Sequence, residues 1–119
     1  MGLNKKAANL LLSHGSVKEV INEYLADVAM FTLRKMPPEI QRQGTVDRGD
    51  QKVTLKAEGV SIDFLHDQRQ GVVEAKVRTE PDFAFPVARR GGGEISFAVG
   101  VEDSGIKLVS KVLSHLGTF

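Results

Sequence analysis

The chain of 119 residues has no cysteine, almost no net charge and no long apolar run. Without cysteine there is no disulfide, no thiolate metal ligand and no cysteine nucleophile, and a reducing compartment fits. Lysine and arginine number 16 against 15 acidic residues, and the net charge of +1 gives no general attraction to nucleic acid or an anionic membrane. The longest apolar-rich stretch, 24–33, is about half of a membrane span. We therefore expect a soluble, cytoplasmic protein with no membrane span, for which nucleic acid is not the expected partner.

Catalytic motifs are also missing. The three histidines form no short metal-ligand pair, and no serine lies in a G-x-S-x-G turn. The nearest cluster of candidate ligands is Asp63, His66 and Asp67, which we interpret as the solvated end of a hairpin. The sequence predicts no catalytic residue, no metal site and no cofactor, and hence no enzyme.

What the chain does have is enough apolar sequence for one folded domain over 1–119. Hydrophobic residues make up 41% and charged residues 26%, as in an ordinary globular protein. At this length a chain can bury a core without disulfides or metals. No repeat or linker divides the sequence.

Three helices are expected. Apolar residues recur at helical spacing over 3–12 and again over 16–35, where Ser16 and Glu19 form a capping box. Pro37 and Pro38 end the second helix. A third, amphipathic helix is expected near 104–116.

The sequence between the second and third helices alternates like strands with one buried face. Alternation is found at 53–57, 60–64, 73–77, 83–87 and 95–101. The segment 39–50 indicates a loop or a weak edge strand. The phase shifts at Gly59, which indicates either a hairpin turn or a bulge, and we favour the bulge. The fold class is α+β: two N-terminal helices, an antiparallel β-meander of four to six strands, and a C-terminal amphipathic helix packed on one face of the sheet.

The second half of the helix at 16–35 is apolar nearly all round. A helix of this kind is normally buried on every side, and a short chain has few layers to cover it. We therefore predict an association surface on the side opposite the main apolar stripe. Its residues are Ala26, Ala29, Met30, Leu33 and Met36. The alternative is that the first helix covers this surface within one chain.

A second candidate is the loop Arg89, Arg90, Gly91, Gly92 and Gly93. Glycines let backbone amides approach an anion and arginines add bidentate contacts, but strand follows the loop, so no helix N-terminus completes a phosphate site. The loop is either a mobile hairpin connection with two solvated arginines or an interaction loop that becomes ordered on binding a partner.

These observations predict a non-catalytic protein-interaction or assembly protein. It would act as a homo-oligomer, with a dimer favoured, or as an accessory subunit of a larger complex. The alternative is a carrier for a small apolar ligand, held in a cavity between helix and sheet.

Overall fold

A computed structural model describes residues 17–81, 93–100 and 105–116. Their elements, in chain order, are α2 (Val17–Lys35), α3 (Pro38–Gln41), β1 (Thr45–Gly49), β2 (Lys52–Ala57), β3 (Val60–Asp67), β4 (Val72–Thr79), β5 (Gly93–Gly100) and α4 (Gly105–His115). The predicted helix at 3–12, the capping serine Ser16 and the predicted strand at 83–87 lie outside the described residues. No helix of the described ranges is long and apolar enough to span a membrane.

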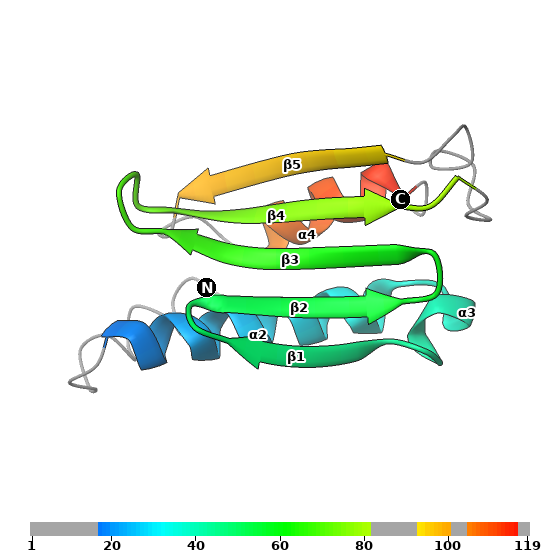
Figure 1. Cartoon of the computed structure of the whole chain (residues 1–119), viewed down its shortest axis with the longest axis horizontal. Helices are drawn as coiled ribbons and strands as arrows, with labels where there is room; N and C mark the ends of the chain where they lie inside the picture. Colours follow the sequence, from blue (N-terminus) through cyan, green and yellow to red (C-terminus); the bar gives the residue numbers. More distant parts are fainter. Residues whose placement is uncertain (1–16, 82–92, 101–104, 117–119) are drawn as a thin grey trace.

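The five strands form one antiparallel sheet in chain order, β1-β2-β3-β4-β5 (Figure 1). The α+β prediction and its antiparallel meander are therefore confirmed. From β2 to β5, each strand alternates apolar and polar residues, so pairing them in register gives the sheet one apolar face. Register pairs Leu55 with Ile62, Ile62 with Val77, and Val77 with Ile95, so one face collects the apolar side chains.

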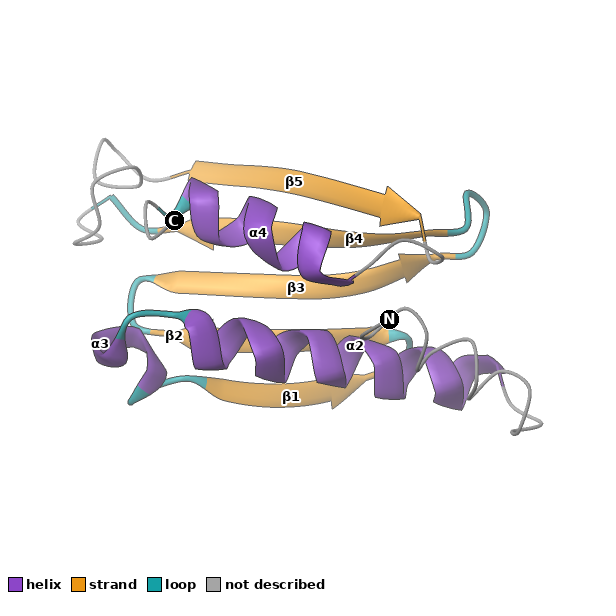
Figure 2. Ribbon diagram, turned by 180° about the vertical axis from the view of Figure 1, so that it is seen from behind, coloured by secondary structure: helices purple, strands orange, loops and turns teal. Residues whose placement is uncertain are grey.

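Both long helices cover that one face (Figure 2). The first, α2, packs mainly on β1 and β2, whereas α4 packs on β4 and β5, and the two helices contact each other. The core lies between the helices and the sheet. Its largest fully buried side chains include Tyr24, Phe64, Leu25, Leu55 and Leu108. The opposite face of the sheet carries the polar members of each alternation.

The segment after α2 is more structured than predicted. Residues 38–41 form α3, and residues 45–49 form the edge strand β1. Of the two structures predicted for 39–50, a loop or an edge strand, the edge strand is therefore confirmed for the second half of this segment. Proline at the first position suits α3, because its missing N–H would have no partner there. The side chain of Gln41 returns to α2 and donates to the carbonyl of Arg34 at 2.6 Å and to that of Met36. These contacts satisfy carbonyls that the end of α2 leaves without partners.

The favoured bulge at Gly59 is wrong. Ala57 pairs with Val60, so Glu58 and Gly59 form a two-residue hairpin turn between β2 and β3. The backbone of Gly59 has φ 81°, while Glu58 stays at negative φ. That combination fits a type II turn, in which glycine takes the second central position. A turn of this type needs only one residue at positive φ, which is why Glu-Gly suffices.

Candidate functional site

The sheet has two edge strands, and they differ in length and charge. At one edge, β1 has five residues, and its centre carries Asp47 and Arg48. Arg48 pairs with the buried Val53, so its position belongs to the helix-covered face, where an edge strand normally carries an apolar residue. Short edges and inward charges are devices that discourage a second strand from pairing. The β1 edge is protected in this way.

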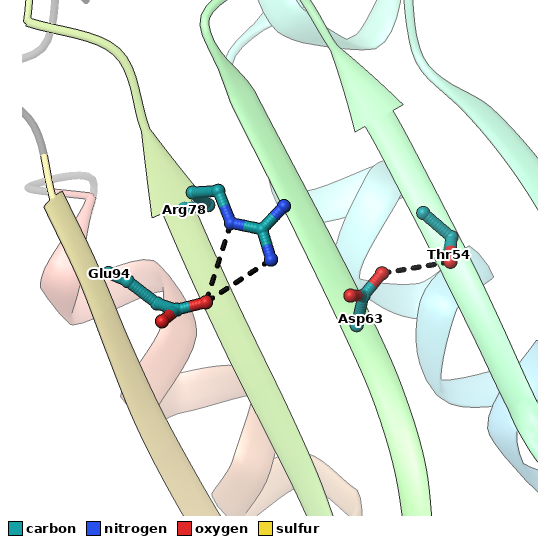
Figure 3. Close-up of polar contacts among 4 residues, drawn as sticks. All are labelled: Thr54, Asp63, Arg78 and Glu94. Carbon is teal, nitrogen blue, oxygen red and sulfur yellow. Dashed lines mark hydrogen bonds and ion pairs between the residues drawn. The ribbon is translucent and has the colours of Figure 1, made fainter.

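The other edge strand, β5, lacks these devices. It is eight residues long, contains no proline, and has Glu94 as its only charged residue. That carboxylate accepts hydrogen bonds from the guanidinium of Arg78 on β4, at 3.2 and 3.4 Å (Figure 3). Among the described residues, no strand pairs with the side of β5 away from β4. Long edge strands with so little charge are templates for pairing with another chain.

The register identifies which backbone groups point away from the sheet. Residues of an antiparallel strand alternate in the neighbour to which they bond, and the hairpin turn at Glu58 and Gly59 makes Ala57 and Val60 a hydrogen-bonded pair. The amide of His66, an even-numbered residue like Val60, accordingly donates to the β1–β2 turn, at the carbonyl of Gln51, 3.3 Å away. Carried across β4, the alternation directs odd-numbered residues of β5 toward β4. The N–H and C=O groups of Glu94, Ser96 and Ala98 therefore point outward from the edge.

Beside this edge, an open groove of about 440 Å³ lies between β5 and α4. It is lined by Ile95, Phe97, Ser110, Lys111, Ser114 and His115. Ile95 is 39% exposed, although its alternation places it on the helix-covered face, because no further strand or helix lies beyond it in the described part of the chain. Phe97 is partly buried, and its ring meets that of His115 edge to face at 5.9 Å. The groove thus has an apolar floor and a polar rim.

Lys111 and His115 are the two groove residues that can carry a charge. Burial lowers the pKa of His115 below its usual 6.5, which favours the neutral ring near neutral pH. Lys111 is exposed, so its ammonium stays in water while its stem covers the groove wall. At neutral pH one lysine is therefore the main charge beside the apolar floor.

The outer face of the sheet is a different kind of surface. Its residues mix charges of opposite sign across neighbouring strands, as in the Arg78–Glu94 ion pair at 3.2 Å. On the same face Thr54 donates a hydrogen bond to Asp63 at 2.8 Å (Figure 3). Since these groups are partnered with one another and meet solvent, this face resembles an ordinary hydrated surface rather than a docking patch.

The five residues of the predicted α2 surface are not exposed together. Ala26, Ala29 and Met36 are buried within the chain, and Leu33 is half-buried against the core. Only Met30 is well exposed, at 41%. Helix α4 packs against α2. The segment after α2 also contributes: a Cβ at Gly44 would lie 2.4 Å from Leu33 Cδ1, and Ile40 of α3, 2% exposed, belongs to the same core cluster as Ala29 and Met36. The segment 39–50, which was expected to be a loop or a weak edge strand, therefore supplies part of this core.

The other sequence-based candidates are distributed as follows. Of the loop 89–93, only Gly93 is described, as the first residue of β5. Asp63 and Asp67 alternate to the outer face of β3, whereas His66 has the phase of buried Phe64, so the three do not converge. No group of three potential metal ligands exists among the described residues. Nδ1 of His66 is buried without a hydrogen-bond partner, and burial lowers the pKa of this ring despite the opposing effect of Asp67.

The edge of β5 was not among the sequence-based candidates. A signal for it is present in the sequence: the run 95–100 has no charge and no proline, whereas Asp47 and Arg48 stand next to each other in β1. That contrast becomes meaningful only once both strands are known to be edges. No protein-family model, no curated protein and no solved structure matches the chain.

Proposed function

We propose that this chain is a non-catalytic interaction protein that assembles by receiving a partner strand at the edge of β5. It would act as a homo-oligomer or as an accessory subunit of a larger complex. The observation that carries the proposal is the contrast between the two edges: β1 is short and charged, and β5 is long and nearly uncharged, with Ile95 39% exposed beside an apolar groove. A cytoplasmic location, which the absence of cysteine fits, is part of the proposal.

Strand addition explains how the groove and the edge would work together. Outward N–H and C=O groups of Glu94, Ser96 and Ala98 would supply main-chain hydrogen bonds, and apolar side chains of the incoming strand would cover Ile95 and Phe97. The interaction therefore needs no catalytic group and no cofactor. The alternative, a carrier for an apolar ligand, has less support, because the groove at β5 lies at the edge of the sheet and opens to solvent.

The proposal is tested by placing proline on each edge in turn. Ala98→Pro removes an outward N–H without removing a bond to β4, so the fold should persist while the edge loses its capacity to pair. Arg48→Pro is the matched control, because the same alternation points the N–H of Arg48 outward from β1. Native mass spectrometry of gently purified full-length protein reports every bound polypeptide.

The expected result is an assembly that Ala98→Pro releases and Arg48→Pro retains. Thermal melting of both variants checks that the fold has survived. The proposal is contradicted if the unmodified chain carries no further polypeptide, or if the folded Ala98→Pro variant keeps the same assembly as the unmodified chain.

A further inference from the structure

We propose that the strand received at this edge is β5 of a second copy, paired antiparallel about a two-fold axis at Ser96. This inference rests on the proposed function and names its partner. It would join two five-stranded sheets into one continuous sheet, with the helices of both copies on the same face.

The outward backbone groups limit the possible registers. Two antiparallel copies can bond only where outward residues face outward residues, and in β5 these are the even-numbered ones: Glu94, Ser96 and Ala98, with Gly100 at its end. With the axis at Ser96, this residue faces its own copy and Glu94 faces Ala98 of the second copy. Each of the three then has a bonding partner. An axis at Phe97 would instead pair Ser96 with Ala98 and Glu94 with Gly100, and it would place the exposed Ile95 opposite Val99, which is already buried in the single chain. The axis at Ser96 is favoured because it pairs the exposed Ile95 with Phe97.

The same register covers the apolar groove. It places Ile95 of each copy opposite Phe97 of the other copy, which gives two such pairs. Both pairs are at non-hydrogen-bonded positions, where facing side chains approach most closely. These are the two strand residues that line the groove, whereas the next inward residue, Val99, is already buried in the single chain. An aromatic ring opposite a β-branched side chain is a favourable cross-strand pair.

Charge distinguishes this edge from the other one. In β5 the only charged residue, Glu94, would face alanine and keep its ion pair with Arg78. The outward residues of β1 are Val46 and Arg48, and pairing them with a second copy places Asp47 opposite itself. Like charges directly opposite each other destabilise a strand pair. Self-pairing is therefore favoured at β5 and opposed at β1.

The flank of α4 has to join the contact, since a stable interface usually buries about 800 Å² per partner, more than one strand supplies. Ser110 and Ser114 lie one helical turn apart on the groove wall and are small enough for a close approach. Lys111 is the lysine on this groove wall, and its exposed, flexible side chain can turn away from the second copy.

A cysteine placed on the two-fold axis tests the register directly. The chain has no cysteine of its own, so Ser96→Cys introduces a single thiol. Facing residues of a hydrogen-bonded pair have Cα atoms about 5.5 Å apart, within the range that a disulfide bridges. Ala98→Cys is the matched control, because in this register the two copies of residue 98 are offset by four residues, roughly 13 Å. Under mild oxidation, Ser96→Cys should form a covalent dimer and Ala98→Cys should not.

Charge mixing gives a second measurement that does not depend on disulfide strain. Ser96→Lys and Ser96→Glu should each weaken the dimer by up to about fivefold, because each places like charges opposite each other at the axis. An equimolar mixture should recover the dimer. The control is the same pair of substitutions at Ser61, which lies on the same face of the sheet but away from the edge. Neither should weaken the dimer, so mixing them should change nothing.

The outcomes separate this inference from the proposed function. Cross-linking through Ala98→Cys instead of Ser96→Cys, or no recovery on mixing, would overturn the two-fold axis at Ser96. If the purified chain alone is monomeric, and the unmodified chain binds a different polypeptide that Ala98→Pro releases, the partner is not a second copy. Strand addition at β5 would then still hold. An assembly that survives Ala98→Pro would overturn both.

Discussion

Truncating Ile40 tests how the far side of α2 is covered. This side chain belongs to the four-residue α3, yet it is only 2% exposed and is part of the main core cluster. Burying an isoleucine contributes about 1.5–3 kcal/mol, and truncation to alanine in a core costs about 2–5 kcal/mol. Because a one-turn helix at the periphery can readjust, we expect Ile40→Ala to lower the free energy of unfolding by about 2–3 kcal/mol.

The matched control is Ile106→Ala, the same substitution at a position that is 48% exposed. It should cost less than about 1 kcal/mol, since much of that side chain already meets water. Urea denaturation at one protein concentration measures both values, and the melting temperature of Ile40→Ala should fall by roughly 10 °C. If the two variants lose the same stability, α3 is not a structural cover, and the apolar far side of α2 must be buried by something else.

Two further predictions concern the ends of β3. Burial lowers the pKa of His66 from 6.5, so its contribution to stability is complete above pH 6.5 and is lost as the pH falls through the lower pKa of the folded state. Thermal melting from pH 7.5 down to pH 5 should therefore show a loss of stability that is smaller in His66→Gln than in the unmodified chain. An equal loss in both would contradict this. At the other end of β3, Gly59→Ala should lower the free energy of unfolding by about 1–2 kcal/mol, because φ is 81° there. Urea denaturation should show no comparable loss for the control Gly49→Ala. A Gly59→Ala variant as stable as the unmodified chain would rule out the assigned turn.

The elements with strong periodicity could be predicted from the sequence. The helix expected at 16–35 is observed as Val17–Lys35, and the strands around Leu55, Ile62 and Val77 follow their alternation. This works because period and burial are local consequences of one apolar face. The turn at Gly59 was harder, because a change of phase follows equally from a hairpin and from a bulge.

The cover of α2 and the site at β5 depend on contacts that no local pattern records. Ile40 is a lone apolar residue in a polar segment, and its burial depends on how the chain turns after Pro38. Alternation in β5 indicates which residues face the helices, but it does not say whether another strand lies beside it. That information comes from strand order and register, so the outward amides of Ser96 and Ala98 could be identified only in the folded chain.

The mass of the unmodified chain in solution tests the central claim most directly. Sedimentation equilibrium over a series of concentrations should approach twice the chain mass of 13.0 kDa, with Ala98→Pro remaining at the chain mass under the same conditions. A purified chain that stays at 13.0 kDa at every concentration would contradict self-pairing through β5.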